Sequence, residues 1–282
     1  MRNVAFGQYY PTGSVVHRLD PRLKILLMLF FIILIFFVKT FVGYAFYAAL
    51  ILVTTLIARV PLRSLLRSVK GVLFLVVFIT IINVFFYSVP VEQTLWHWWV
   101  LSVSVEGLLH AAKMALRIIL LVTGPALLTF TTTPMELTDA LESLLSPLKL
   151  IKFPVRDLAV IMSIALRMIP TLMEETDRIM LAQKARGADL DTGGFFARVK
   201  ALVPVLIPLF VGAFRRAEEL ALALDSRCYN ASAHRTRYRV LRPHLRDLFA
   251  VLLFGVFAAG TILSITTFDF DMMIYEGIKA LL

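Results

Sequence analysis

Two short segments place an arginine between small residues at the end of an Ala/Leu-rich, helix-forming run. They read Ala185-Arg186-Gly187 and Ser226-Arg227-Cys228. At about 100° per residue, each arginine falls near the edge of the apolar stripe of its helix. A guanidinium carries a fixed charge and a rigid fork of donors that suits a carboxylate, and small neighbours let a partner surface approach closely. Spacing alone leaves a second interpretation open, in which both are ordinary C-terminal arginines that stabilise the helix dipole.

The sequence contains no motif for catalysis and none for binding a metal or cofactor. It lacks a glycine-rich phosphate loop followed by Lys and Ser/Thr, and it lacks H-E-x-x-H. Cys228 is the only cysteine, so an internal disulfide is excluded. His17 and Asp20 would suit a metal or proton site. They also suit an interfacial histidine and a helix N-cap, because Asp20 precedes Pro21.

Composition indicates an integral membrane protein. Of the 282 residues, 59% are hydrophobic, and the mean hydropathy is +0.83. Soluble domains contain about 45–50% apolar residues. The formal net charge of +10 is typical of basic cytoplasmic loops, so no nucleic acid is needed to explain it.

Five apolar stretches approach the roughly 20 residues that cross a bilayer core. They cover residues 23–38, 41–58, 71–89, 108–130 and about 247–268. We therefore predict an all-α membrane protein with about five transmembrane helices. Residues 1–130 would form an N-terminal membrane region, and residues 131–246 a region of long amphipathic helices between spans four and five. Residues 247–282 would form the last transmembrane helix and a tail.

The distribution of basic residues predicts the orientation in the membrane. Lys and Arg are frequent before the first span, in the turn 59–70 and throughout 131–246, and they are absent from 90–105. The positive-inside rule then places the N-terminus and region 131–246 in the cytoplasm and the C-terminus outside. The loop 90–105 contains Trp96, Trp98 and Trp99, which indicate an outer aromatic belt or, alternatively, a ligand site.

Region 131–246 shows several helix signals. Thr133-Pro134-Met135-Glu136 is a capping box. A second helix is predicted from about Pro154, with a kink or break at Pro170 and a left-handed stop at Gly187. The apolar run 199–213 is interrupted by two prolines, which predicts a buried or interfacial segment before the last helix.

A series of motifs completes the pattern. They are Gly7-Gln8-Tyr9, His17-Arg18-Leu19-Asp20-Pro21-Arg22-Leu23-Lys24, Thr131-Thr132-Thr133-Pro134, Leu166-Arg167-Met168-Ile169-Pro170, Ala182-Gln183-Lys184-Ala185-Arg186-Gly187 and Ser226-Arg227-Cys228-Tyr229. Together they resemble the transmembrane coupling subunit, or T-component, of energy-coupling-factor transporters, which are ATP-driven importers of vitamins and trace nutrients. Cys228 departs from the pattern, since glycine there would make the second arginine motif match the first.

The resemblance implies a division of labour among several chains in a prokaryotic cell membrane. The two arginine motifs would dock into two ABC-type ATPase subunits, which would bind ATP and Mg²⁺, so this chain itself would need no cofactor. The apolar faces of the cytoplasmic coupling helices would hold a substrate-binding membrane subunit. The residues expected to do so are Leu172, Met173, Thr176, Ile179, Met180, Leu220 and Leu224. The opening motif points to a shared type that serves several substrate subunits.

Other classes of membrane protein would require other sequence features. A self-contained secondary transporter should contain intramembrane acids or broken helices at matching positions in two halves. The permease of a conventional ABC importer is another alternative. A membrane enzyme would need a nucleophile or a metal cluster, and the sequence shows neither.

Overall fold

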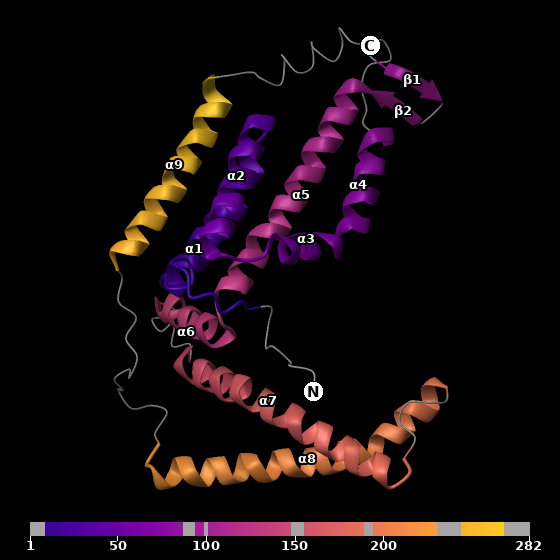
Figure 1. Cartoon of the computed structure of the whole chain (residues 1–282), viewed down its shortest axis with the longest axis vertical. Helices are drawn as coiled ribbons and strands as arrows, with labels where there is room; N and C mark the ends of the chain where they lie inside the picture. The colour runs from indigo at the N-terminus through magenta and orange to yellow at the C-terminus, as the bar shows by residue number, and fades with distance from the viewer. Residues whose placement is uncertain are drawn as a thin grey trace. The chain divides into compact units, whose positions relative to one another are not determined.

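The structure is a computed structural model that describes residues 9–86, 94–98, 101–147, 155–188, 194–229 and 244–267. These residues belong to two compact units, which are described separately. The first contains helices α1 to α5 and α9, and the second contains α7 and α8 (Figure 1). The predicted features at Gly7-Gln8, at Trp99, in the loop 189–193 and in the tail after residue 267 lie outside the described residues.

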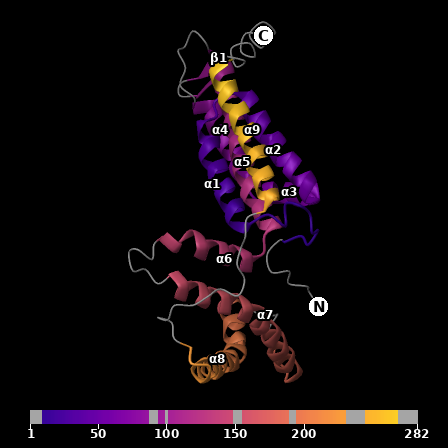
Figure 2. The same ribbon diagram turned by 90° about the vertical axis from the view of Figure 1, so that its left-hand side faces the viewer.

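The first unit is a bundle of helices. Its long members are α1 (Pro21–Phe37), α2 (Phe41–Ala58), α4 (Leu73–Phe86), α5 (Val105–Thr131) and α9 (Leu245–Thr267). In both views α1 and α4 run along α5, and α9 runs along α2 (Figures 1 and 2). The short helix α3 (Leu62–Lys70) links α2 to α4, and α6 (Pro134–Leu144) follows α5.

The helix lengths show which of the five predicted spans are long enough to cross a membrane. Among the described residues, α2, α5 and α9 are long and apolar enough to cross a membrane, and α3 with α4, bent by 58°, would make a fourth span. This confirms a helical membrane protein. Helix α1 has 17 residues, about 26 Å at 1.5 Å per residue, and α4 has 14. Both fall short of the roughly 20 residues of a full span, so the count of five stays a prediction.

One short loop departs from the helical prediction. Strands β1 (Thr94–Trp98) and β2 (Leu101–Ser104) pair antiparallel, with Trp96 opposite Val103. Aromatic and β-branched residues favour a pleated strand pair, which explains why this Trp-rich loop forms a hairpin.

Close packing and one arginine hold the centre of the bundle. The rings of Phe31 and Tyr47 meet edge to face at 5.2 Å between centroids. A Cβ on Gly124 would lie 2.7 Å from Phe31, so glycine is needed where α5 approaches α1. Arg117 of α5 donates to Val38 O and to Tyr44 Oη, both at 2.9 Å. Its charge therefore faces protein, as expected for a cation inside a span.

The opening segment closes one end of the bundle through a buried lysine. Lys24 is 7% exposed, and its ammonium donates to His17 O, Thr131 O and Thr132 Oγ1 at 3.2, 3.0 and 3.2 Å. Thr12 Oγ1 donates to Ala58 O at 2.7 Å. The opening segment, α1 and the ends of α2 and α5 are thus joined by hydrogen bonds.

The structure favours the capping interpretation of the opening motif. Asp20 accepts from Arg22 N at 3.0 Å and caps α1. His17 is buried, and its Nδ1 lies 2.8 Å from Ser14 Oγ. Burial lowers the pKa of His17, which favours the neutral ring. The described residues hold no group of His, Cys, Asp and Glu suited to a metal.

Replacing Lys24 tests how strongly this end depends on its ammonium. Lys24→Met should leave buried oxygens without a donor and lower the free energy of unfolding in detergent by about 2 kcal/mol. Lys39→Met, at an exposed lysine after α1, is the matched control and should change stability little. Equal unfolding midpoints for the two variants would contradict the role assigned to Lys24.

Candidate functional site

The second unit consists of two long helices that continue through their prolines. Helix α7 covers Val155–Ala185 with Pro170 inside it, and α8 covers Phe195–Ser226 with Pro204 and Pro208 inside it. The breaks predicted at Pro204 and Pro208 were therefore wrong, and at Pro170, where a kink or a break was predicted, the helix does not break. Pro208 cannot donate to the carbonyl of Pro204 four residues earlier. Gln183 Nε2 of α7 lies 3.4 Å from that oxygen and donates to it, which offsets part of the loss.

Helices α7 and α8 cross in antiparallel directions. Glu175 Oε2 of α7 accepts from Arg216 Nη2 of α8 at 2.8 Å, and both side chains are about one-third exposed. A Cβ on Gly212 would lie 2.9 Å from Glu175 Oε1, so the glycine leaves room for the carboxylate. Together with the Gln183–Pro204 contact, this pair fixes residues 175–183 of α7 against 204–216 of α8.

Both helices end in the same hydrogen-bonded motif. At the end of α7, Gly187 N donates to Lys184 O and Ala188 N to Gln183 O, both at 3.0 Å. At the end of α8, the corresponding bonds are Cys228 N to Asp225 O at 2.8 Å and Tyr229 N to Leu224 O at 3.0 Å. This is the Schellman arrangement, in which the residue after the cap is left-handed.

The left-handed positions are Gly187, with φ of 85°, and Cys228, with φ of 53°. The stop predicted at Gly187 is confirmed, and Cys228 makes the same stop without being glycine. Arg186 and Arg227 therefore occupy equivalent cap positions. Both triplets are exposed, and neither guanidinium pairs with an acid among the residues that the structure describes. The two ends lie at opposite ends of the crossed helices (Figure 1).

Comparisons with known proteins indicate the family of this chain. The family profile described as "Cobalt transport protein" (CbiQ) matches residues 12–238. The energy-coupling factor transporter transmembrane protein EcfT of Thermanaerovibrio acidaminovorans is 49% identical over 261 residues, which cover 91% of this chain and 94% of the relative. EcfT of Ruminiclostridium cellulolyticum is 46% identical over 263 residues, covering 93% and 97%. EcfT of Staphylococcus aureus is 41% identical over 254 residues, covering 90% and 94%.

The chain belongs to the EcfT family. The resemblance predicted from its short motifs is confirmed, and the chain is a membrane component of an energy-coupling-factor transporter.

The predicted contact surface of this EcfT protein lies partly inside the helix crossing. Most of its residues are half-buried, namely Leu172, Thr176, Ile179, Met180, Leu220 and Leu224. Residues 172, 176, 179 and 180 share the face of α7 that carries Glu175 and Gln183, both of which contact α8. Met173 is 41% exposed and is the accessible member of the set.

Sequence reasoning did not single out a broader apolar surface on α8. The exposed residues there are Val199, Leu202, Val203, Leu206, Ile207, Phe210, Val211 and Phe214. Their signal was the apolar run 199–213, which the prolines caused us to interpret as a separate buried or interfacial segment. Helix α8 is continuous, and the run presents large side chains on the surface of the described unit, so it is not buried there, and the interfacial alternative stays a prediction.

The two left-handed stops should respond in opposite ways to substitution. A left-handed L-residue costs about 1–2 kcal/mol, so Gly187→Ala should weaken its stop and Cys228→Gly should strengthen the other. No atom lies within 4 Å of a Cβ placed on Gly187, so strain rather than a clash is tested. We expect roughly five- to 30-fold faster exchange of the Ala188 amide hydrogen and correspondingly slower exchange at Tyr229. Cys228→Ala is the control and should leave Tyr229 unchanged; faster exchange in Cys228→Gly would contradict the motif.

Proposed function

We propose that this EcfT protein couples ATP hydrolysis by two nucleotide-binding subunits to movement of a substrate-binding membrane subunit, for uptake of vitamins or other micronutrients. The observation that carries the proposal is the pair of equivalent, exposed helix ends that present Arg186 and Arg227. Two similar ATPase chains would each bind one docking element. The two elements should therefore have the same geometry, as these two helix ends do. ATP and Mg²⁺ would be held by those partners.

Each arginine would act as an anchor in a partner groove. The flat guanidinium can form two parallel hydrogen bonds with one carboxylate, and a groove that excludes water strengthens such a pair. The neighbours Ala185, Gly187, Ser226 and Cys228 are small, so a groove wall can approach the helix backbone. The triplets offer no bulky side chain that would keep a partner away.

The crossing would make the two anchors move together. Glu175, Arg216 and Gln183 tie α7 to α8, so a displacement of either end is transmitted through the contact. Closure of the ATPase pair on ATP would then move both helices as one element. This links a local event at the nucleotide to a larger motion of whatever rests on the helices.

Apolar side chains would hold the substrate-binding subunit. Met173 would be the accessible part of the predicted set on α7, and the exposed residues of α8 from Val199 to Phe214 would offer a second apolar surface. Methionine and leucine side chains adapt to different surfaces, which suits a component that accepts several substrate subunits.

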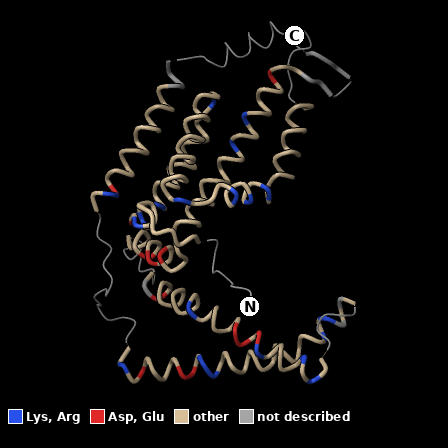
Figure 3. The backbone as a smooth tube through the Cα atoms, viewed as in Figure 1, with Lys and Arg blue, Asp and Glu red and all other residues tan. Residues whose placement is uncertain are grey.

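Charge supports the orientation of the bundle. Basic residues gather at the end where α1 begins and along α3, as Figure 3 shows; they include Arg18, Arg22, Arg59, Arg63, Arg67 and Lys70. By the positive-inside rule this end lies in the cytoplasm, with the N-terminus inside and the C-terminus outside.

The competing function, a self-contained secondary transporter or conventional permease, receives less support. Helices α2, α5 and α9 carry acids only in a first turn, at Glu106 and Asp247.

The anchoring role is tested by truncating both arginines. Removing one partner of a desolvated charge pair costs about 2–5 kcal/mol, so Arg186→Ala and Arg227→Ala should each lower affinity for one ATPase by roughly 30-fold or more. The double variant should reach the membrane in normal amounts yet lose ATPase recovery and nutrient uptake. Lysine at either position should restore the function only in part, since it keeps the charge but not the fork.

The matched control is Arg215→Ala, an exposed arginine within α8 that pairs only with Glu219 one turn away among the described residues. It should assemble and transport normally. If the arginines merely stabilise helix dipoles, the losses amount to about 0.3–1 kcal/mol of helix stability. Near-normal ATPase recovery and uptake by the double variant would therefore refute the anchoring role.

A further inference from the structure

Helix α3 (Leu62–Lys70) carries a row of cations that the proposed coupling does not use. Arg63, Arg67 and Lys70 are exposed, and none of the three pairs with an acid in the part of the chain that the structure describes. At 100° per residue, the three positions fall within an arc of about 60° on the helix. Like charges at spacings of three and four residues repel one another, and an anionic partner would relieve that repulsion.

Two leucines are exposed beside this row. Leu62 is 48% exposed and Leu66 is 66% exposed. On the helix their arc adjoins the arc of the cations without mixing with it. A partner that fits this face therefore offers hydrocarbon next to anions. The boundary between the acyl chains and the headgroups of a bilayer has this composition.

The opposite face of α3 is held against the bundle. Ser64 Oγ lies 2.6 Å from Tyr10 Oη, a hydrogen bond to the opening segment. Leu65 is half-buried and packs against the hydrophobic core of the bundle. These contacts prevent α3 from turning Leu62 and Leu66 inward, so the packing itself determines which residues face outward.

The neighbouring helices place α3 at the edge of the membrane. The spanning helix α2 ends at Ala58, and the apolar helix α4 begins at Leu73. Nine residues of helix are about 14 Å long, so α3 stays close to both helices that it joins. Its axis is bent by 58° from α4, as Figure 1 shows. Three cations on nine residues would be costly within the acyl chains, and they are favourable at the headgroups.

The helices around α3 carry few acids. The sequence has no Asp or Glu between Pro21 and Val91, so α1 to α4 carry none. Helix α5, which packs against α3, has Glu106 in its first turn and no other acid. Figure 1 shows α3 beside the later part of α5, away from that turn. No acid within these helices therefore offsets the cations of α3.

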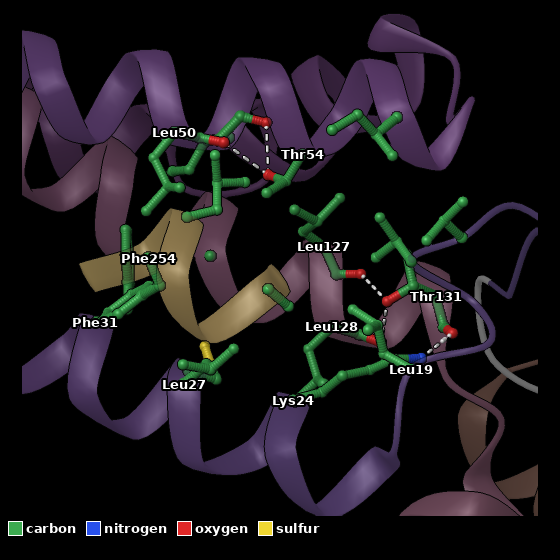
Figure 4. Close-up of a pocket in the computed structure, with 18 of the residues that line it drawn as sticks. Leu19, Lys24, Leu27, Phe31, Leu50, Thr54, Leu127, Leu128, Thr131 and Phe254 are labelled. Carbon is green, nitrogen blue, oxygen red and sulfur yellow. Dashed lines mark hydrogen bonds between the residues drawn. The ribbon is translucent and has the colours of Figure 1, made fainter. Parts of the chain in front are cut away.

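The whole basic end of the bundle keeps a positive charge when all of its acids are counted. Eight cations and four acids leave a net charge of +4; the cations are Arg18, Arg22, Lys24, Arg59, Arg63, Arg67, Lys70 and Arg246, and the acids are Asp20, Glu136, Asp139 and Asp247. Among these cations Lys24 is the buried one, with its ammonium bonded to Thr131 O (Figure 4). The others lie at or near the surface, where an anionic layer can reach them.

We propose that α3 is an interfacial helix that binds the headgroups of anionic phospholipids. Leu62 and Leu66 enter the acyl-chain layer, and Arg63, Arg67 and Lys70 contact lipid phosphates. Helix α3 is then the interfacial end of the bent span that it forms with α4. In the orientation proposed above, this leaflet is the cytoplasmic one. The proposal does not involve the arginine-bearing ends of α7 and α8, so its failure would leave the coupling role unaffected.

The depth of α3 is tested with nitroxide labels on the full chain in vesicles of phosphatidylcholine and phosphatidylglycerol. The lone cysteine is first removed by Cys228→Ser. A label on Leu66→Cys should be relaxed mainly by oxygen, which concentrates in the acyl chains. A label on Arg67→Cys should be relaxed mainly by a water-soluble nickel chelate. Equal access of the nickel chelate to both labels would overturn the interfacial placement.

The headgroup preference is tested with diazirine derivatives of phosphatidylglycerol and phosphatidylcholine, mixed in equal amounts. On peptides from α3 of the wild-type chain, phosphatidylglycerol adducts should exceed phosphatidylcholine adducts at least tenfold. Each cation near an anionic surface contributes up to about fivefold. The triple variant Arg63→Gln, Arg67→Gln, Lys70→Gln should therefore bring the ratio of the two adducts close to one. A wild-type ratio of one, or a ratio that the triple variant leaves unchanged, would contradict the proposal.

The matched control removes the same charge from exposed positions of the other unit. Arg178→Gln, Lys200→Gln, Arg215→Gln should leave the ratio on α3 unchanged. Arg67→Lys keeps the charge and should also preserve it. The single variant Arg67→Gln should lower the ratio two- to fivefold, so the test does not depend on the folding of the triple variant.

A protein partner is distinguished from lipid by a benzophenone amino acid in place of Leu66 in cell membranes. The proposal predicts adducts with phospholipid. An adduct with an ATPase, with another membrane subunit or with a second copy of this chain would show that an acidic protein surface covers α3, and it would overturn the lipid assignment.

Discussion

The contact between α7 and α8 is the constraint on which the coupling account depends. The Glu175–Arg216 pair and the bond from Gln183 to Pro204 O set the register of two antiparallel helices. That register fixes the positions of the two helix ends relative to each other. Arg186 lies three residues beyond Gln183, and Arg227 lies 11 residues beyond Arg216, about 16 Å along the helix. Without the contact, each arginine would sit on an independent helix, and a force at one would not reach the other.

Local sequence signals predicted the helix ends well. Gly187 was expected to stop a helix because only glycine enters the left-handed region freely, and its φ of 85° agrees. Cys228 gave no such signal. Its positive φ is imposed by the Schellman bonds of Tyr229 and Cys228 itself, which are visible only in three dimensions.

The prolines mark where sequence reasoning failed. Pro204 and Pro208 were expected to interrupt a helix, and Pro170 to kink or break one, since each removes one backbone donor. The lost bond at Pro208 is partly replaced by Gln183, which comes from another helix 25 residues earlier in the chain. A tertiary contact of this kind leaves no trace in the local pattern. As a result, the apolar run was assigned to a separate segment rather than to one continuous helix α8.

In the bundle, too, local sequence signals predicted individual helices but not the contacts between distant segments. Hydropathy located α2, α5 and α9, and the cap at Asp20 followed from its position before Pro21. The role of Lys24 did not follow, because its acceptors include Thr131 and Thr132, more than 100 residues away. Motif matching had flagged these residues as family features, and the structure supplies the reason that they occur together.

The most direct test of the account asks what each surface touches in the assembled transporter. A photo-cross-linking amino acid is placed at Ala185, at Ser226 or at Met173, one per variant, and adducts are identified after illumination of intact membranes. The account predicts ATPase adducts from Ala185 and Ser226, and adducts with the substrate-binding membrane subunit from Met173. Adducts from Ala185 and Ser226 with the membrane subunit, or none with either ATPase in an assembled complex, would contradict the claim that these helix ends are the docking points.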